Sequence, residues 1–364
     1  MTSFVFADLV ALASLSLLPI SWMRDISERL RAGEPAASLF ARLVAERSVA
    51  DPDRFAWVHD RAVASLDRAT AGHISPLPWS DVAYPPALAA IVDPPALLWV
   101  RGSVDALAAQ PVVAIVGARA ASPYGLAVAE RLAGDLAARG VMIVSGLARG
   151  VDSAAHRGAL AGGGVTVAVL GSGADVIYPP EHAALAREMV ERGAIVSEFV
   201  PGTPPNPFFF PQRNRIISGL ARAVVVIEAG EKSGSLITAR SALEQGRDVL
   251  AVPGNVLTGR NRGAHGLLRD GAKIVETADD ILEELHLSAG VNLRGPADAS
   301  EPAKAPVDAV LASLTAGEPC DLDAIAERSG LNSARLLPRL FELEVQGLVR
   351  RVGGGRFVRI DRPC

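Results

Sequence analysis

VVAIVGARAASPYGLAVAERLAGDLAARGVMIVSGLARGVDSAAH, residues 112–156, is the stretch that decides the fold of this chain. It contains two short apolar runs, Val112–Val116 and Val141–Val144, and each leads through a glycine turn into a helical pattern. Unbroken β-branched and apolar residues predict strands covered on both faces of a parallel sheet. Ser122 followed by Pro123 is typical of a helix N-cap and first helical residue. The stretch therefore predicts two consecutive strand–turn–helix units.

Arginines follow both strands, at the end of the sheet where helix N-termini point their N–H groups. Arg119 follows the first strand and Arg149 the second, so this edge is expected to bind an anion. A dinucleotide fingerprint, G-x-G-x-x-G, is absent because Arg119 stands in place of the second glycine. The later turn Gly171–Gly173 also breaks that pattern. An NAD-type dehydrogenase is therefore disfavoured.

Bulk composition narrows the class of protein. The 364 residues favour two or three domains, and 49% hydrophobic with 21% charged residues predicts globular structure. A net charge of −4 argues against a globally basic nucleic-acid binder, but it leaves room for a local basic cleft.

Cysteine usage and the first apolar run indicate a cytoplasmic protein. Cys320 and Cys364 do not form a disulfide framework, and no Cys/His cluster has metal-ligand spacing, so neither a metal nor a cofactor is expected. The run Phe4–Ile20 contains Asp8 and lacks preceding basic residues. We interpret it as a buried helix rather than a membrane span or signal peptide.

Four segments organise the chain. Residues 1–72 predict an N-terminal helical domain, with helices over Phe4–Leu18, Ile26–Arg31, Ala36–Glu46 and Arg54–Ala69. Residues 73–290 predict a parallel α/β domain, since strands and helices alternate after a proline-rich connector at 73–110. Within the connector, Leu97–Val100 could add a strand at the edge of the sheet.

Residues 291–306 are a predicted linker, rich in Ala, Pro, Gly and Ser, and 307–364 predict a winged helix of three helices and a hairpin. Its third helix and wing carry basic residues that favour DNA contact, while a protein-contact module remains open; these residues are Arg335, Arg339, Arg350, Arg351, Arg356 and Arg359.

Further candidate binding groups follow the later strands. The loop Lys232-Ser233-Gly234-Ser235 opens a helix and can direct N–H groups and hydroxyls at a phosphate. Between residues 200 and 218, prolines predict a stiff irregular loop, with Phe208–Phe210 just before Arg213 and Arg215. Aromatic and guanidinium groups suit a single nucleic-acid strand. The alternative is that two phenylalanines plug the sheet and the arginines pair with Glu198 or Glu228.

Asp152 and His156 lie at i and i+4 of the second helix, which would allow acid–base chemistry. A capped helix start beside a hydrogen-bonded histidine explains the pair better.

The motifs taken together resemble the DprA/Smf family of DNA-processing proteins. The resemblance covers about residues 70–285, through VGARAASPYG, SGLARGVDSAAHRGAL, AVLGSGADVIYPP, SEF, FPQRNRIISGLA, EAGEKSGSLITARSALEQGRDVLAVPG and GAHGLLRDGA in this order. It implies a Rossmann-like domain that binds single-stranded DNA, forms a homodimer, protects incoming DNA in natural transformation and loads RecA onto strands covered by single-strand-binding protein. It also implies a binding protein rather than an enzyme.

The resemblance places DNA binding on Arg119, Arg149, Arg213, Arg215 and Lys232, with Ser122, Asn214, Ser233, Gly234 and Ser235 as backbone-contacting neighbours. Two alternatives are a sensor of free nucleotides and a nucleotide N-glycosidic hydrolase of a related fold. The hydrolase is disfavoured, because Arg240 and Ser241 follow Thr238 where its carboxylate should stand.

Overall fold

The computed structural model describes residues 6–47, 52–287, 309–314, 320–331, 333–345, 349–352 and 356–359. The chain divides into two compact units, residues 1–294 and 295–364. The predicted linker at 291–306 lies outside the described residues. The domain boundaries at 72 and 290 stay predictions.

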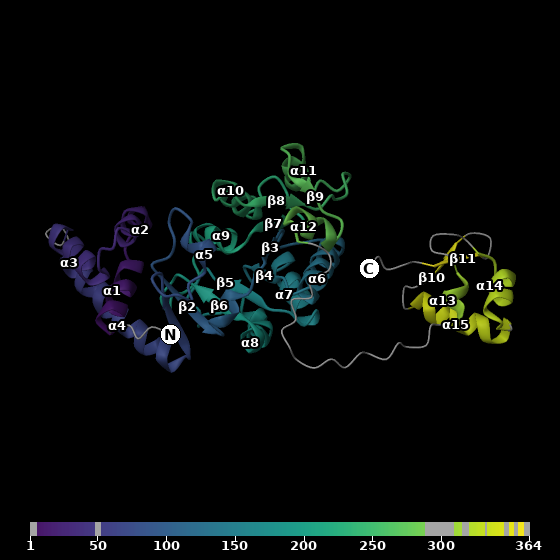
Figure 1. Cartoon of the computed structure of the whole chain (residues 1–364), viewed down its shortest axis with the longest axis horizontal. Coiled ribbons are helices and arrows are strands. Elements are labelled where there is room, and N and C mark those ends of the chain that lie inside the picture. The colour runs from purple at the N-terminus through teal and green to yellow at the C-terminus, as the bar shows by residue number, and fades with distance from the viewer. Residues whose placement is uncertain are drawn as a thin grey trace. The chain divides into compact units, whose positions relative to one another are not determined.

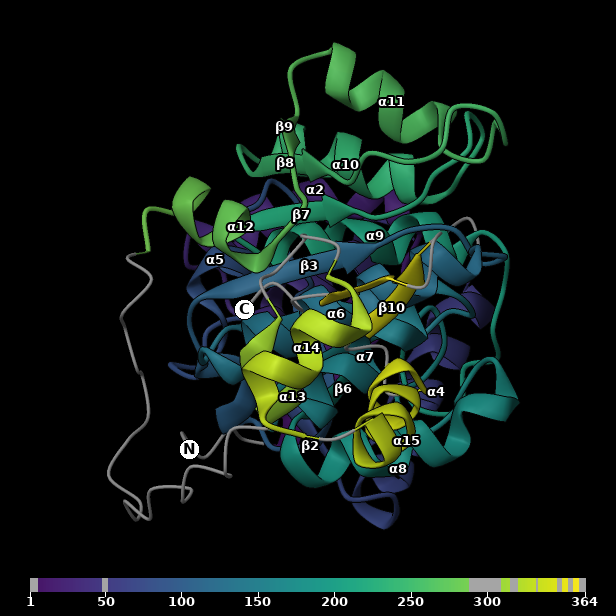
Figure 2. The same cartoon turned by 90° about the vertical axis from the view of Figure 1, so that its right-hand side faces the viewer.

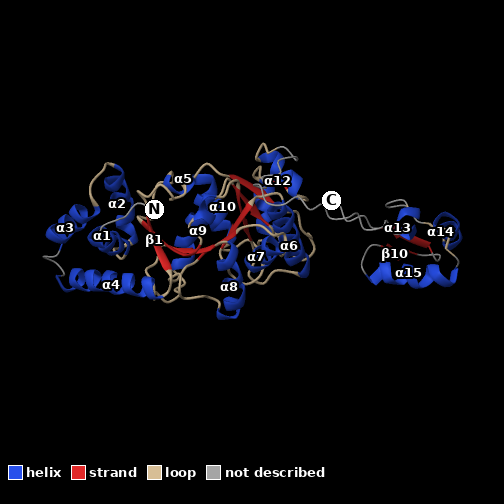
Figure 3. Ribbon diagram, turned by 60° about the horizontal axis from the view of Figure 1, so that its bottom comes forward, coloured by secondary structure: helices blue, strands red, loops and turns tan. Residues whose placement is uncertain are grey.

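In the described part of the first unit, nine strands form one sheet in the order β1-β2-β6-β5-β4-β3-β7-β8-β9. They are β1 Ile74–Pro78, β2 Leu97–Gly102, β3 Val112–Val116, β4 Met142–Ser145, β5 Thr166–Val169, β6 Ala194–Ser197, β7 Ala223–Val226, β8 Asp248–Ala251 and β9 Lys273–Ile274. From β6 to β9 all neighbours are parallel, whereas β2 runs antiparallel to both β6 and β1. The α/β class is confirmed, and Figure 3 shows the strands as a twisted layer among helices.

The outermost strand on the β2 side differs from the prediction. The strand at Leu97–Val100 exists, but β1 covers it, so β2 is not the edge. We did not predict β1 from the sequence, because Pro76 and Pro78 argue against a strand. An edge strand tolerates proline because one of its sides needs no ladder hydrogen bonds.

Helices cover both faces of the sheet. On one face α6 Pro123–Ala138, α7 Val151–Ala161 and α12 Ala278–Glu284 bury a core with alternate residues of the central strands. On the other face lie α5 Pro86–Ala89, α9 Phe209–Leu220, α10 Ser235–Glu244 and α11 Arg262–Arg269. Helices α10 and α11 lie beside β8 (Figures 1 and 2), and α8 Ala183–Arg192 packs near β6. Short 3₁₀ turns occur at Ile20–Trp22, Asp105–Ala108 and Pro180–His182.

The topology places a crevice between β3 and β7. Strand β3 begins the parallel layer, and the chain builds outward from it first through β4 and later through β7. At such a switch point the following loops diverge to opposite faces, and ligands bind beyond the carboxyl ends of the strands. The predicted binding turns follow these strands.

The N-terminal helices are α1 Phe6–Ser16, α2 Met23–Arg31, α3 Ala36–Arg47 and α4 Pro52–Ala71. They share a small core that includes Leu15, Ile26 and Leu39. Helices α1 and α4 also pack against the outer strands, where their residues bury Leu97 and Trp99. Contacts thus join these helices to the sheet in one compact unit. Among the described residues, no helix combines the length and apolar character that a membrane span requires.

The second unit contains α13 Ala309–Ser313, α14 Leu322–Ser329, α15 Ser333–Val345 and the antiparallel pair β10 Val349–Val352 and β11 Arg356–Arg359. This is the predicted winged-helix arrangement, with a core of Val310, Ile325, Leu336, Leu340, Leu343 and Phe357 among others. The side chains of Arg335, Arg350, Arg351 and Arg359 lie outside the described part. DNA contact by this unit therefore stays a prediction.

Candidate functional site

A cleft of about 730 Å³ lies at the carboxyl ends of β3, β4 and β7. Its walls come from the turn after β3, the start of α7, the first turns of α9 and the loop before α10. Groups far apart in sequence meet here, namely Arg119, Asp152, Phe210, Arg213, Asn214, Lys232, Ser233, Gly234 and Ser235. Seven of the ten predicted DNA-binding residues are therefore in the cleft lining, without Ser122, Arg149 and Arg215.

The charge of the cleft is positive. Arg119 and Lys232 are exposed, and Arg213 is only 4% exposed. Among the described lining residues the one acidic side chain is Asp152, which is buried. Three cations facing one buried carboxyl group give the cleft a positive charge that suits an anion.

Arg213 is a buried cation that protein groups leave partly unsatisfied. Within the described chain, neither Nε nor Nη1 of Arg213 has a hydrogen-bond partner. Burial lowers its pKa to about 10, against the attraction of Asp152, so the guanidinium stays charged at neutral pH. Gly146 makes room for it, because a Cβ there would lie 1.5 Å from Nη1. A buried charge without full partners is costly, and an anion in the cleft would relieve that cost.

The loop before α10, predicted to be a phosphate-binding turn, lies in the wall of the cleft. The hydroxyls of Ser233 and Ser235 are 2.7 Å apart, and Asn214 Nδ2 donates to the carbonyl of Gly234 at 3.4 Å. Gly234 is exposed, and a Cβ added to it would meet no atom within 4 Å. Its φ of −61° does not require glycine. The space in front of this backbone is therefore open to a ligand.

The three consecutive phenylalanines have separate environments. Phe209 stacks on Phe199 with ring centroids 4.3 Å apart, whereas Phe208 is 83% exposed. Phe210 packs against Tyr178 at 5.8 Å and lies under the Arg119 guanidinium, 5.0 Å from Cζ to the ring centroid. One ring is thus held by the protein, one lines the cleft beneath a cation, and one is free to stack on a base.

The proline-rich loop is shorter than predicted. We expected an irregular loop between residues 200 and 218, but α9 begins at Phe209 and includes Pro211. Proline is tolerated in the first helical turn, where its missing N–H has no intrahelical partner. This earlier start places Arg213 and Asn214 on a helix rather than on a loop.

Arg215 turns away from the cleft. Its Nη2 donates to Glu198 at 2.7 Å and its Nε to Asp93 at 3.0 Å, and the side chain is 10% exposed. Burial by itself lowers the pKa of Arg215, but these two carboxylates raise it above its usual value. The alternative of an arginine paired with Glu198 thus holds for this residue, and its predicted phosphate contact does not fit.

Ser122 and Arg149 also lie outside the cleft lining. Ser122 caps α6 by accepting from the Gly125 N–H at 3.1 Å, and it donates to the Glu228 carboxylate. It faces a separate cavity of about 480 Å³. Arg149 is exposed and pairs with Glu181.

The Asp152–His156 pair does not form an acid–base couple. Asp152 accepts from the Ala148 N–H at 3.3 Å, and His156 Nδ1 bonds the hydroxyl of Thr166 at 2.7 Å. The N-cap of α7 is Gly150, one residue before the helix, and not Asp152.

Sequence reasoning did not assign Gly146 or Tyr178 to the site, although Gly146 follows β4 as Gly117 follows β3.

Comparisons with known proteins agree with this architecture. The family model of DNA recombination-mediator protein A matches residues 76–286, and that of the DprA winged helix domain matches 295–355. Protein Smf of Escherichia coli is 42% identical over 287 residues, which cover 77% of this chain and 76% of that protein. DNA processing protein DprA of Streptococcus pneumoniae is 47% identical over 204 residues, 56% of this chain and 72% of that protein.

Two solved structures are similar in fold. The crystal structure of DprA from Streptococcus pneumoniae has a TM-score of 0.67 and 37% identity, covering 78% of this chain and 99% of that one. A structure of DprA from Helicobacter pylori, which concerns the single-stranded DNA binding mode of that protein, has a TM-score of 0.53 and 30% identity, covering 58% and 95%. With two family models matched in order and relatives covered over most of their length, this chain belongs to the DNA recombination-mediator protein A family, the DprA/Smf proteins.

Proposed function

We propose that this protein is a recombination mediator that binds single-stranded DNA in the cleft beyond β3, β4 and β7. The observation that carries the proposal is the set of three cations, Arg119, Arg213 and Lys232, around one buried carboxyl group. The Streptococcus pneumoniae relative is named a DNA processing protein, and the Helicobacter pylori structure concerns single-stranded DNA binding by that protein. Binding rather than catalysis is the role we assign to the cleft.

The dimensions of the cleft favour an unpaired strand. Its volume of about 730 Å³ is within the usual range of ligand pockets, about 300–1,000 Å³. A pocket of this volume suits one or two splayed nucleotides of an unpaired strand. The exposed ring of Phe208 can stack on a base without sequence preference.

By family membership we extend the proposal to the biological role. The protein protects incoming strands in natural transformation, acts in the cytoplasm as a homodimer, and loads RecA onto DNA covered by single-strand-binding protein. The measurement is the rate at which RecA replaces single-strand-binding protein on a labelled oligonucleotide. We expect this rate to rise with added protein, and an unchanged rate contradicts the loading role.

Fluorescence-anisotropy titration of one labelled oligonucleotide, single-stranded and duplex, at two salt concentrations tests strand binding. We expect much tighter binding of the single strand, with log affinity falling against log salt by about 0.7 per neutralised phosphate. Arg119→Ala combined with Lys232→Ala should abolish most binding, since charge-assisted phosphate contacts contribute about 1.5–3 kcal/mol each.

The matched control is Arg131→Ala combined with Arg187→Ala, which removes equal charge from helices α6 and α8. Equal weakening by both pairs would show general attraction rather than a cleft site. Equal affinity for duplex and single strand contradicts the proposal directly.

One observation favours a second candidate function, in which the cleft binds or cleaves free nucleotides. Asp152 lines the cleft, and burial raises the pKa of its carboxyl group, as an acid catalyst of glycosidic cleavage would need. We expect no free base to be released from nucleoside monophosphates, because this carboxyl group accepts from a backbone N–H and lies near the charge of Arg213. Release of base identifies a hydrolase, and tight nucleotide binding without release identifies a sensor.

A further inference from the structure

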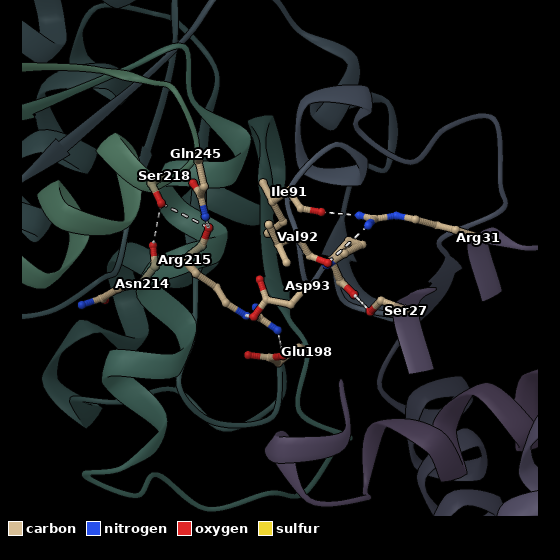
Figure 4. A network of polar contacts seen from close by, with 11 residues as sticks. Ser27, Arg31, Ile91, Val92, Asp93, Glu198, Asn214, Arg215, Ser218 and Gln245 are labelled. Carbon is tan, nitrogen blue, oxygen red and sulfur yellow. Dashed lines mark hydrogen bonds and ion pairs between the residues drawn. The ribbon is translucent and has the colours of Figure 1, made fainter. Parts of the chain in front are cut away.

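A polar network behind the cleft connects the N-terminal helices to α9 (Figure 4). Helix α9 presents Arg213 and Asn214 to the cleft, and Arg215 on its other side reaches Asp93 and Glu198. The N-cap residue of α9, Phe208, makes no side-chain capping bond. Arg215 lies in the middle of α9, where its ion pairs and the bond that Gln245 Nε2 donates to its carbonyl at 3.0 Å are polar anchors of the helix.

Asp93 belongs to the segment at 86–95 that packs against α9. Helix α5 and the residues just after it touch α9 so closely that a Cβ on Gly219 would lie 2.8 Å from Leu88 and 3.2 Å from Ile91. The Asp93 side chain is 34% exposed, at the margin of this contact. The Asp93 carboxylate can pair with Arg215 only while the segment at 86–95 keeps this backbone conformation.

Helix α2 holds the segment at 86–95 in this conformation through hydrogen bonds to its backbone carbonyls. Arg31 donates to the carbonyls of Ala89 at 3.1 Å and Val92 at 3.3 Å, and also to that of Ile91. Ser27 Oγ donates to the carbonyl of Pro94 at 3.2 Å. Figure 4 shows Arg31 pointing from α2 toward Ile91 and Val92, with Asp93 directed at Arg215. Backbone groups on both sides of Asp93 are thus bound by one helix.

We propose that Arg31 and Asp93 are positioning residues for the strand-binding helix α9. Arg31 fixes the backbone around Asp93, Asp93 with Glu198 fixes Arg215, and Arg215 fixes the turn that carries Arg213 and Asn214. The inference rests on the proposed function of the cleft. It makes the N-terminal helices a part of the DNA-binding unit rather than an independent appendage.

The test combines binding with hydrogen exchange in the full chain. Arg31 is exposed, so Arg31→Ala removes its hydrogen bonds to the segment at 86–95 without leaving a cavity in the core. Its matched control is Arg24→Ala on the same helix, where the arginine pairs with Glu28 and touches no carbonyl of the segment. We expect Arg31→Ala to weaken single-strand binding about three- to tenfold, and Arg24→Ala to leave it unchanged.

A double-mutant cycle distinguishes positioning from direct phosphate contact. In the Asp93→Asn background, Arg31→Ala should cause little further loss, because both act through Arg215. In DNA-free protein, Arg31→Ala should speed amide exchange over 209–220 but not over 123–138 in α6. Wild-type protein that fails to bind DNA overturns the proposed function, and exchange still decides the positioning role. Unchanged exchange in α9, or an undiminished loss in the Asp93→Asn background, overturns the proposal.

Discussion

Two arginines separated by one residue have opposite roles. Successive helical residues turn by about 100°, so Arg213 and Arg215 lie on nearly opposite sides of α9. One is a buried cation left partly unpaired at the cleft, and the other is neutralised by two carboxylates. What surrounds each guanidinium, and not the residue type, determines which one can bind an anion.

His156 makes the stability of the protein depend on pH. Burial, followed by the nearby His182 and Arg213, lowers its pKa from 6.5 to about 3. The unfolded chain therefore binds an additional proton between these values, and stability is lost as the pH falls below 6.5. We expect about 2 kcal/mol less stability from this group at pH 5 than at neutral pH, measured by urea unfolding.

The control for this prediction is His156→Gln, which can still bond Thr166 but does not titrate. It should flatten the change in stability between pH 7 and pH 5.5, above the ordinary range of the carboxyl groups. A variant with the same pH dependence as wild-type protein would contradict the assignment to His156.

At the scale of the element, the N-terminus of α6 is already occupied. Ser122 accepts from Gly125, and the buried Glu228 carboxylate accepts from the Ser122 N–H at 3.1 Å. A carboxylate at a helix N-terminus is stabilised by the helix dipole, and it repels a phosphate. This terminus therefore serves stability, whereas the start of α10 faces the open cleft.

Ser122→Ala should accordingly lower the free energy of unfolding by about 1 kcal/mol, because the cap is lost. Single-strand affinity should stay within about twofold, since Ser122 does not line the cleft. Urea unfolding and anisotropy measure the two effects, with Ser38→Ala on the exposed side of α3 as the control. A loss of affinity as large as that of Lys232→Ala would place Ser122 at the strand after all.

At the scale of the whole molecule, strand binding and the winged helix are assigned to different compact units. All described residues of the cleft lie between Val116 and Thr238, within the first unit. The second unit has a separate hydrophobic core, which is formed by residues of that unit. Each unit therefore has the apolar core that independent folding requires.

A chain that ends at Arg294 should keep most single-strand affinity, within about threefold, because charge-assisted contacts in the cleft are intact. Anisotropy on the same labelled oligonucleotide compares it with full-length protein. Loss of binding on truncation, together with retained binding by the Arg119→Ala and Lys232→Ala variant, would mean that the DNA site is in the second unit.

The sequence by itself determined the parallel α/β class, the edge of the sheet at which the cleft lies, and the winged-helix pattern. These features are encoded by local signals: apolar runs too short for helices, glycine turns, and helix starts such as Ser122-Pro123. Because every parallel strand ends at the same edge, the positions of Arg119 and Lys232 after their strands sufficed to place both in one cleft.

Only the tertiary structure decided which polar groups meet. Arg215 and Asp93 are 122 residues apart in sequence, and their contact depends on α5 packing against α9. The prolines of β1 argue against a strand in the sequence, and only the position of β1 at the edge of the sheet accounts for them. Local patterns determine which elements form, whereas ion pairs and buried charges depend on the order of the strands and the packing of helices over them, which no short stretch of sequence contains.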